Sequence, residues 1–93
     1  MKQYKLSPKP PLHKLCFTAL AGPAYVFEYG EQKYGAGNWS DADNGGGDHV
    51  GAALRHIGEF VDGEACDAES GLHHLDHAIS RLMMARGKEL KKK

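Results

Sequence analysis

Apolar side chains recur at helical spacing in two stretches of the chain, and no stretch shows the alternation of a β-strand. The first stripe predicts a helix over about residues 49–62 and consists of Val50, Ala53, Leu54, Ile57, Phe60 and Val61. The second predicts a helix from about Glu69 or Ser70 to Arg86 and consists of Leu72, Leu75, Ile79, Leu82 and Met83. We expect each stripe to face the core of the domain.

Residues that start and stop helices bound these two segments and a third one. Pro23 suits the first position of a helix that runs to residue 34, and Gly35 ends it. Asp48 is a good N-cap for the second helix, and Gly63 stops that helix. Gly87 closes the last helix. These signals predict an all-α fold with three main helices.

The segments outside the helices differ from them in composition. Residues 1–14 contain three prolines that block a helix, so we expect an extended arm. Residues 36–47 form a polar, Gly-rich loop, and residues 88–93 a basic tail. A chain of 93 residues buries only roughly 60–65% of its unfolded surface. We therefore expect residues 1–93 to form a single helical domain, a small bundle completed by oligomerisation.

Composition narrows the class of protein. The 41% of hydrophobic and 26% of charged residues are ordinary for a globular domain, and no apolar run approaches the roughly 18 residues of a membrane helix. The basic N-terminus lacks the apolar stretch of a signal peptide. Cys16 and Cys66 stand apart, which favours reduced thiols over a disulfide. These features predict a cytoplasmic protein that does not bind membranes.

Charge is distributed unevenly along the chain, although its formal net value is zero. Residues 15–85 carry eleven acids and three strong bases, and the remaining lysines and Arg86 lie towards the two ends. Such an acidic body repels a nucleic-acid backbone, so we expect no direct nucleic-acid binding. A nucleotide would need divalent cations to bridge carboxylate and phosphate. The alternative is that the acids only maintain solubility.

Two carboxylate pairs have a spacing that suits metal chemistry. Glu28-x-x-Glu31 and Glu59-x-x-Asp62 each place two carboxylates on neighbouring turns of one helix face. Two such pairs on packed helices would form an oxygen cage suited to Mg²⁺ or Mn²⁺. The same spacing is common on solvated helices, which is the alternative interpretation.

Histidines form a second constellation. Among six histidines, His56 precedes Glu59 by one turn, and His74, His77 and Arg81 share one side of the last predicted helix, opposite its apolar stripe. In a monomer this side would be open surface, whereas in an assembly it would line a cleft. The remaining histidines are expected to be structural: His13, His49 and His73.

Two further features lie in loops. Asp67, in the turn between the last two helices, could either cap the helix that follows or bind a metal ion, and the sequence favours neither role over the other. In the Gly-rich loop, the ring of Trp39 would stack on a base whose edge Asn38 reads, or would fold onto the core.

The motifs of the chain resemble the phage-type dATP/dGTP diphosphohydrolase N-terminal domain family, from about Lys9 to Leu82. The resemblance is carried by Glu28-Tyr29-Gly30, Lys33-Tyr34-Gly35, Asn38-Trp39, Ala52-Ala53-Leu54-Arg55-His56, Asp62-Gly63-Glu64, Asp67, Glu69-Ser70-Gly71-Leu72, His74 and His77. The two acid pairs also resemble the signature of MazG-like all-α nucleotide pyrophosphohydrolases.

The resemblance implies an oligomeric, metal-dependent enzyme of the host-cell cytoplasm that hydrolyses dGTP or dATP to the monophosphate and pyrophosphate. The implied metal ligands are Glu28, Glu31, Glu59 and Asp62, and the implied catalytic residues are Glu28, Glu31 and His56. The expected nucleotide-binding residues are Lys33, Asn38, Trp39, Arg55, His56, Asp67, His74, His77 and Arg81.

Two other classes of function remain open at this stage. A non-catalytic phage protein on the same scaffold would sequester a signalling nucleotide to counter host defence, and the face with histidines and Arg81 is suited to phosphate without a metal. An adaptor would instead bind a host protein and show no response to nucleotides.

Overall fold

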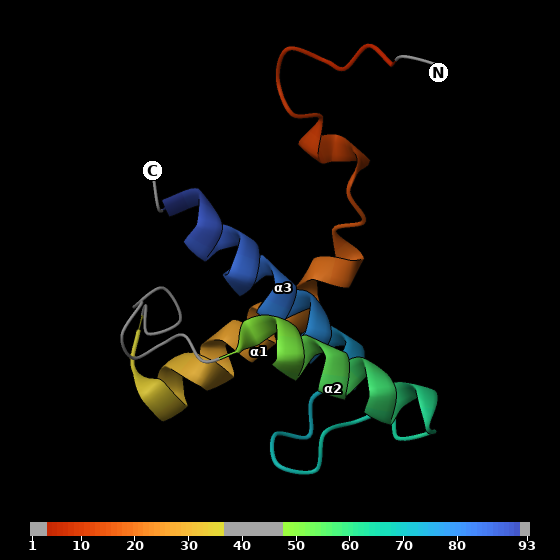
Figure 1. Ribbon diagram of the computed structural model, residues 1–93, viewed down its shortest axis with the longest axis vertical. Helices are drawn as coiled ribbons and strands as arrows, with labels where there is room; N and C mark the ends of the chain where they lie inside the picture. Colours follow the sequence, from red (N-terminus) through yellow and green to blue (C-terminus); the bar gives the residue numbers. More distant parts are fainter. Residues whose placement is uncertain (1–3, 37–47, 92–93) are drawn as a thin grey trace.

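The computed structural model describes residues 4–36 and 48–91, and most of the Gly-rich loop lies outside this range. The described part is all-α, as predicted. Its elements are a short 3₁₀ turn, η1 (Leu12–Lys14), followed by α1 (Thr18–Tyr34), α2 (His49–Val61) and α3 (His74–Lys91). Helix α3 is central, because it packs against both α1 and α2 (Figure 1).

Helix α2 has almost the predicted bounds, and its N-terminal cap is confirmed. The carboxylate of Asp48 accepts a hydrogen bond of 2.8 Å from the backbone N–H of Gly51, which satisfies one of the free donors of the first turn. At the other end, Gly63 has a φ of 105°, a left-handed conformation that glycine adopts without strain. The chain therefore leaves the helix one residue earlier than predicted.

Helix α1 begins earlier than predicted. It starts at Thr18, so Pro23 lies inside the helix rather than at its first position, and it is buried there. A proline removes one backbone N–H, and in this helix the missing bond is the one to the carbonyl of Ala19. The other residues before Pro23 still form the first turn, so the helix extends on both sides of it.

The predicted bounds of α3 were wrong at both ends. The helix starts at His74 because the preceding residues form a closed loop, in which Asp67 N–H bonds to Leu72 O and His74 N–H to Ala65 O, both at 2.8 Å. The helix then continues through Gly87 to Lys91. A glycine inside a helix costs only about 1 kcal/mol, which the surrounding helical residues tolerate.

The buried faces of α2 and α3 are not the predicted apolar stripes. Leu54 is 63% and Val61 72% exposed, so the expectation that the stripes form the core was wrong. Ala53 is the one stripe residue that is buried, and the other buried side chains of the two helices are mostly small or polar: His49, Ala52, His56, His74, His77, Ala78, Ser80 and Met84. Small side chains allow two helix backbones to approach closely, and the larger apolar residues then lie on the outer sides of the pair.

The contact between α1 and α3 is equally close. A Cβ atom on Gly22 would lie 2.0 Å from a carboxylate oxygen of Asp76, so any other residue there would require the Asp76 side chain to move. The hydroxyl of Ser80, which is fully buried, donates a 3.1 Å hydrogen bond to the carbonyl of Pro23. The two helices are thus joined by a buried polar contact as well as by close packing.

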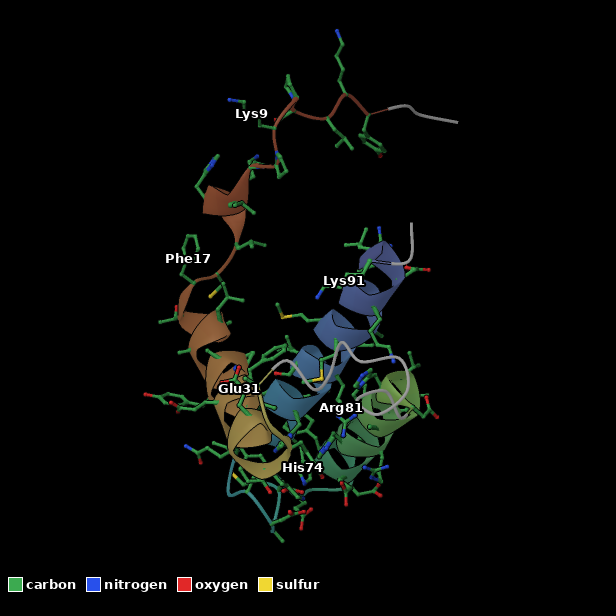
Figure 2. The ribbon with its side chains drawn as sticks, turned by 90° about the vertical axis from the view of Figure 1, so that its left-hand side faces the viewer. Lys9, Phe17, Glu31, His74, Arg81 and Lys91 are labelled. Atoms are coloured by element: carbon green, nitrogen blue, oxygen red, sulfur yellow. The ribbon has the colours of Figure 1, made fainter. Side chains whose placement is uncertain are left out.

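The arm and the C-terminal end of α3 lie at one end of the molecule, and the loop between α2 and α3 lies at the other (Figures 1 and 2). Figure 2 shows Lys9 and Phe17 on the arm side, away from the packed helices. The radius of gyration of 15.1 Å exceeds the about 12 Å typical of this chain length, as a projecting arm requires. None of the helices within residues 4–36 and 48–91 has the length and apolarity to cross a lipid bilayer.

Candidate functional site

Three imidazole rings meet between α2 and α3. His56 of α2 and His77 of α3 are 7% exposed, and His74 of α3 is 0% exposed. The rings of His56 and His77 stack with centroids 4.4 Å apart, and the ring of His74 lies 5.0 Å from that of His56. The expectation that this side of a monomer would be open surface was wrong, because a single chain already buries it.

The hydrogen bonds of His74 determine where its proton lies. Its Nε2 atom is 2.7 Å from the Glu64 carboxylate, which only accepts, so Nε2 carries the hydrogen. In neutral His74, Nδ1 then has a lone pair, and it lies 2.8 Å from Nδ1 of His56. His56 therefore donates from Nδ1, and its Nε2 atom retains a lone pair available to a ligand or a proton.

His77 belongs to a chain of hydrogen bonds that begins in the loop before α3. The Asp67 carboxylate accepts bonds from the Ser70 backbone N–H at 2.9 Å and from the Ser70 hydroxyl at 3.0 Å. The same hydroxyl lies 2.7 Å from Nε2 of His77 and accepts that atom's hydrogen. Asp67 thus caps the turn at Ser70 rather than helix α3, and it also orients His77.

Burial lowers the pKa of two rings of the cluster, His56 and His77. Loss of solvent lowers the pKa of His56 from 6.5 to about 4, and the nearby His77 and His74 rings add to this effect because positive charges there would repel each other. Burial also lowers the pKa of His77, although the Asp67 carboxylate opposes the change. At pH 7 the His56 and His77 rings are therefore neutral, and each carries one N–H.

A second group of side chains borders the cluster from α1. The Tyr29 hydroxyl donates a 2.8 Å hydrogen bond to Oε2 of Glu69, and the ammonium of Lys33 pairs with the same oxygen. The Tyr29 ring meets the His77 ring edge-on, with centroids 6.3 Å apart. These contacts raise the pKa of Tyr29 and lower that of Glu69, in each case mainly through hydrogen bonding.

Two sets of side chains within the described residues each bring three candidate metal-ligand atoms close together. The ligand atoms of each set lie within 4.8 Å of one another. One set is His56, Asp67 and His74, and the other is Glu59, Glu64 and His74. Glu59 Oε1 lies 3.6 Å from Nδ1 of His74, so Glu59 is the member of the predicted carboxylate quartet that reaches the cluster.

The other predicted metal ligands lie outside these two sets. Glu28 and Glu31 are exposed on α1, and Asp62 is exposed where α2 ends. Figure 2 shows Glu31 on α1 and His74 between the helices, on different elements. The four-carboxylate cage therefore remains a prediction that the fold of a single chain does not assemble.

The predicted nucleotide contacts are distributed over several regions. Arg81 of α3 donates a 2.8 Å hydrogen bond to Nδ1 of His49, a buried residue at the start of α2. Arg55 is exposed on α2. Asn38 and Trp39 lie outside the described residues.

Sequence reasoning missed several partners of the histidines. Glu64 bonds to His74, Ser70 bonds to His77, and Tyr29 with Glu69 borders the cluster. Their positions are separated by seven to 48 residues from the histidines they approach, so helical periodicity does not connect them. The available signal was their presence in the motifs that carried the family resemblance.

These observations define a small all-α domain with a histidine–carboxylate cluster between its helices. The chain belongs to the dATP/dGTP diphosphohydrolase N-terminal domain family, whose profile matches residues 2–93. A relative from Salmonella phage PMBT28, described as a dATP/dGTP diphosphohydrolase, is 42% identical over 60 residues. The match covers 64% of this chain but 20% of that relative, so the chain spans about a fifth of its length. No solved structure matches the chain.

Proposed function

We propose that this chain is a nucleotide-hydrolysing domain that converts dGTP or dATP to the monophosphate and pyrophosphate. The observation that carries the proposal is the buried cluster of His56, His74 and His77 with Asp67 and Glu64 at its edge. Membership of the family and the printed activity of the phage relative support the same reaction class.

A divalent cation is part of this proposal. The carboxylates of Glu59, Glu64 and Asp67 surround His74, and such a donor set fits a cation better than it fits a bare triphosphate. When bound, Mg²⁺ or Mn²⁺ would neutralise phosphate charge and favour departure of pyrophosphate. Glu28, Glu31 and Asp62 remain proposed ligands that would have to be brought to the site by a second copy of the chain.

His56 has the proposed role of general base. In the reaction, a bond forms between the oxygen of water and the α-phosphorus, and the bond to the oxygen bridging the α- and β-phosphates breaks. Pyrophosphate leaves with that electron pair, and the free Nε2 of His56 accepts the proton of water. The pKa of about 4 makes His56 a weak base in the free protein, but the negative charge of a bound triphosphate would raise it.

The proposed oligomer accounts for the exposed apolar stripe of α2. Val50, Leu54, Ile57 and Val61 follow one another at intervals of four, three and four residues, the spacing of a coiled-coil seam. Val50, Leu54 and Val61 are 49%, 63% and 72% exposed in the single chain. We therefore expect Leu54→Glu to reduce the molar mass measured by light scattering to that of the monomer. The control Leu6→Glu, in the arm, should leave the mass unchanged, and an unaltered mass in both variants would contradict the seam.

Hydrolysis is tested by incubating the 93-residue chain with dGTP, dATP and Mg²⁺ or Mn²⁺, followed by chromatography of the nucleotide. We expect dGMP or dAMP and pyrophosphate, and a decrease of roughly tenfold or more in Glu59→Gln, because that carboxylate lies beside the cluster. Glu89→Gln, an exposed residue paired with Arg86, is the matched control and should retain full activity. A Glu59→Gln variant with unchanged turnover would remove Glu59 from the site.

The second candidate function is nucleotide binding without turnover. The pairing of Arg81 with His49 favours it, because a ring nitrogen holds this half-buried guanidinium in place while its other N–H groups can donate to a phosphate. In the same assay it predicts a raised melting temperature and recovery of the intact nucleotide. An adaptor for a host protein predicts neither effect.

A further inference from the structure

We propose that His56, Asp67 and His74 form a binding site for a first-row transition ion of octahedral preference, such as Mn²⁺, Fe²⁺, Co²⁺ or Ni²⁺. The site is distinct from the carboxylate cage predicted from the acid pairs, and it goes beyond the proposed hydrolysis because it requires no nucleotide. Its three ligands come from α2, from the loop that precedes α3, and from α3 itself.

His74 is oriented as a metal ligand. The Glu64 carboxylate takes the hydrogen on Nε2 at 2.7 Å, so the lone pair of Nδ1 points to the other side of the ring. Metal-binding histidines usually donate their second N–H to a carboxylate in this manner, which fixes the ring and makes the ligating nitrogen more basic. Since the side chain is 0% exposed, packing also restricts its rotation.

The distance between the Nδ1 atoms of His56 and His74 indicates which metal coordination geometry the site prefers. The Nδ1 atoms of His56 and His74 are 2.8 Å apart and share one hydrogen in the metal-free protein. An ion about 2.1 Å from both atoms would displace that hydrogen, which neutral His56 would then carry on Nε2, and would form an N–metal–N angle of about 85°. A chain loaded in this way would not use Nε2 of His56 as the general base. Adjacent ligands of an octahedral ion make an angle of about 90°, whereas a tetrahedral ion would need nitrogens about 3.4 Å apart.

Asp67 provides a negative ligand within reach. Its ligand atom lies within 4.8 Å of those of both histidines, so a small side-chain adjustment would bring all three to one ion. The Ser70 backbone and hydroxyl bond to Oδ2, which leaves Oδ1 without a bond to Ser70. The remaining coordination positions are then available to water or to an anionic ligand.

The donor types select the class of ion. Two imidazoles and one carboxylate suit the divalent ions of the first transition series, whereas Mg²⁺ prefers oxygen ligands alone. The short distance between the nitrogens disfavours tetrahedral Zn²⁺. We therefore expect Co²⁺ and Ni²⁺ to bind more tightly than Mn²⁺, and Mg²⁺ to bind weakly.

The test uses the full chain, freed of metals with a chelator, and no nucleotide. We expect Co²⁺ at one hundred times its Kd to raise the melting temperature by roughly 10 °C, and Mg²⁺ at the same concentration to leave it unchanged. The visible absorption of bound Co²⁺ should have the weak intensity of octahedral coordination. Titration calorimetry should show Co²⁺ affinity reduced roughly tenfold or more in Asp67→Asn.

Glu89→Gln is the matched control, because Glu89 is an exposed acid of α3 that pairs with Arg86 outside the site, and it should bind Co²⁺ as the unmodified chain does. Circular dichroism of Asp67→Asn confirms that the variant is folded. Equal affinity for Mg²⁺ and Co²⁺, an intense tetrahedral spectrum, or unchanged binding in folded Asp67→Asn would overturn the proposal. A chain that binds Co²⁺ but leaves dGTP intact would support this site and contradict the proposed hydrolysis.

Discussion

Lowering the pH from 7 to 4.5 is expected to destabilise the metal-free protein by up to about 3 kcal/mol through His56 alone. The unfolded chain binds a proton at this residue with a pKa of 6.5, whereas burial keeps the folded residue neutral down to about 4. Protons therefore favour the unfolded state between these two values. Stability should be highest above pH 6.5, fall as the pH decreases, and become constant for this group near pH 4, with His77 contributing in the same direction.

Urea unfolding at several pH values, in the presence of a chelator, measures this dependence. His56→Gln should be less stable at pH 7 but should show a smaller slope between pH 6.5 and 4.5, because it removes the titrating ring. His13→Gln replaces an exposed histidine of the arm and should retain the full slope. A free energy of unfolding that stays constant between pH 7 and 5 would show that the imidazoles are not buried as described.

Replacing His74 with alanine is expected to cost about 3 kcal/mol of stability at pH 7. The ring is fully buried, so its removal leaves a cavity between α2 and α3. The variant also leaves the Nδ1–H of His56 without its acceptor. For a domain of this size such a loss lowers the melting temperature by roughly 12–24 °C.

Thermal unfolding followed by circular dichroism provides the measurement. His74→Gln, which keeps a hydrogen-bonding side chain of similar length, should lose less stability than His74→Ala. His13→Ala should melt with the unmodified protein, because its side chain is exposed. A loss below about 1 kcal/mol in His74→Ala would indicate that the cluster does not support the packing of the two helices.

The sequence predicted best those features that depend on neighbouring residues. The number of helices, the cap at Asp48 and the extent of α2 follow from local propensity and from hydrogen bonds within three residues. The start of α3 does not, because the sequence predicts it at Glu69 or Ser70, whereas residues 69–73 belong to the loop. Backbone hydrogen bonds that join Asp67 to Leu72 and His74 to Ala65 close a loop there. The spacing of apolar residues along the sequence does not reveal such hydrogen bonds.

The buried face was predicted wrongly for a physical reason. Periodicity locates the side of a helix where large apolar groups gather, and it assumes that this side meets the rest of the same chain. The buried side chains of α2 and α3 include Ala52, Ala53, Ala78 and Ser80, of which only Ala53 belongs to a predicted stripe. Such small side chains add little to an apolar stripe but allow close packing. Whether an exposed stripe meets a second copy depends on another molecule, which a single sequence does not contain.

The candidate site was predicted in part. His56, Asp67, His74 and Glu59 were expected functional residues, and the fold brings their ligand atoms into two overlapping sets. Their mutual geometry arises from the loop between α2 and α3, which places Glu64 against His74 and Ser70 against His77. The sequence therefore indicated which individual residues carry suitable chemical groups. It did not indicate which of these groups are hydrogen-bonded to one another, because that depends on the folded structure.

The placement of the two chain ends has an electrical consequence. The arm that carries Lys5, Lys9 and Lys14 lies at the same end of the molecule as the C-terminal end of α3, which carries Lys88 and Lys91, whereas the acidic loop after α2 lies at the opposite end (Figure 1). Positive and negative charge are therefore separated along the described part of the chain. At low ionic strength an anion would be attracted to the end with the lysines, and 0.15 M salt would limit this attraction to about 8 Å.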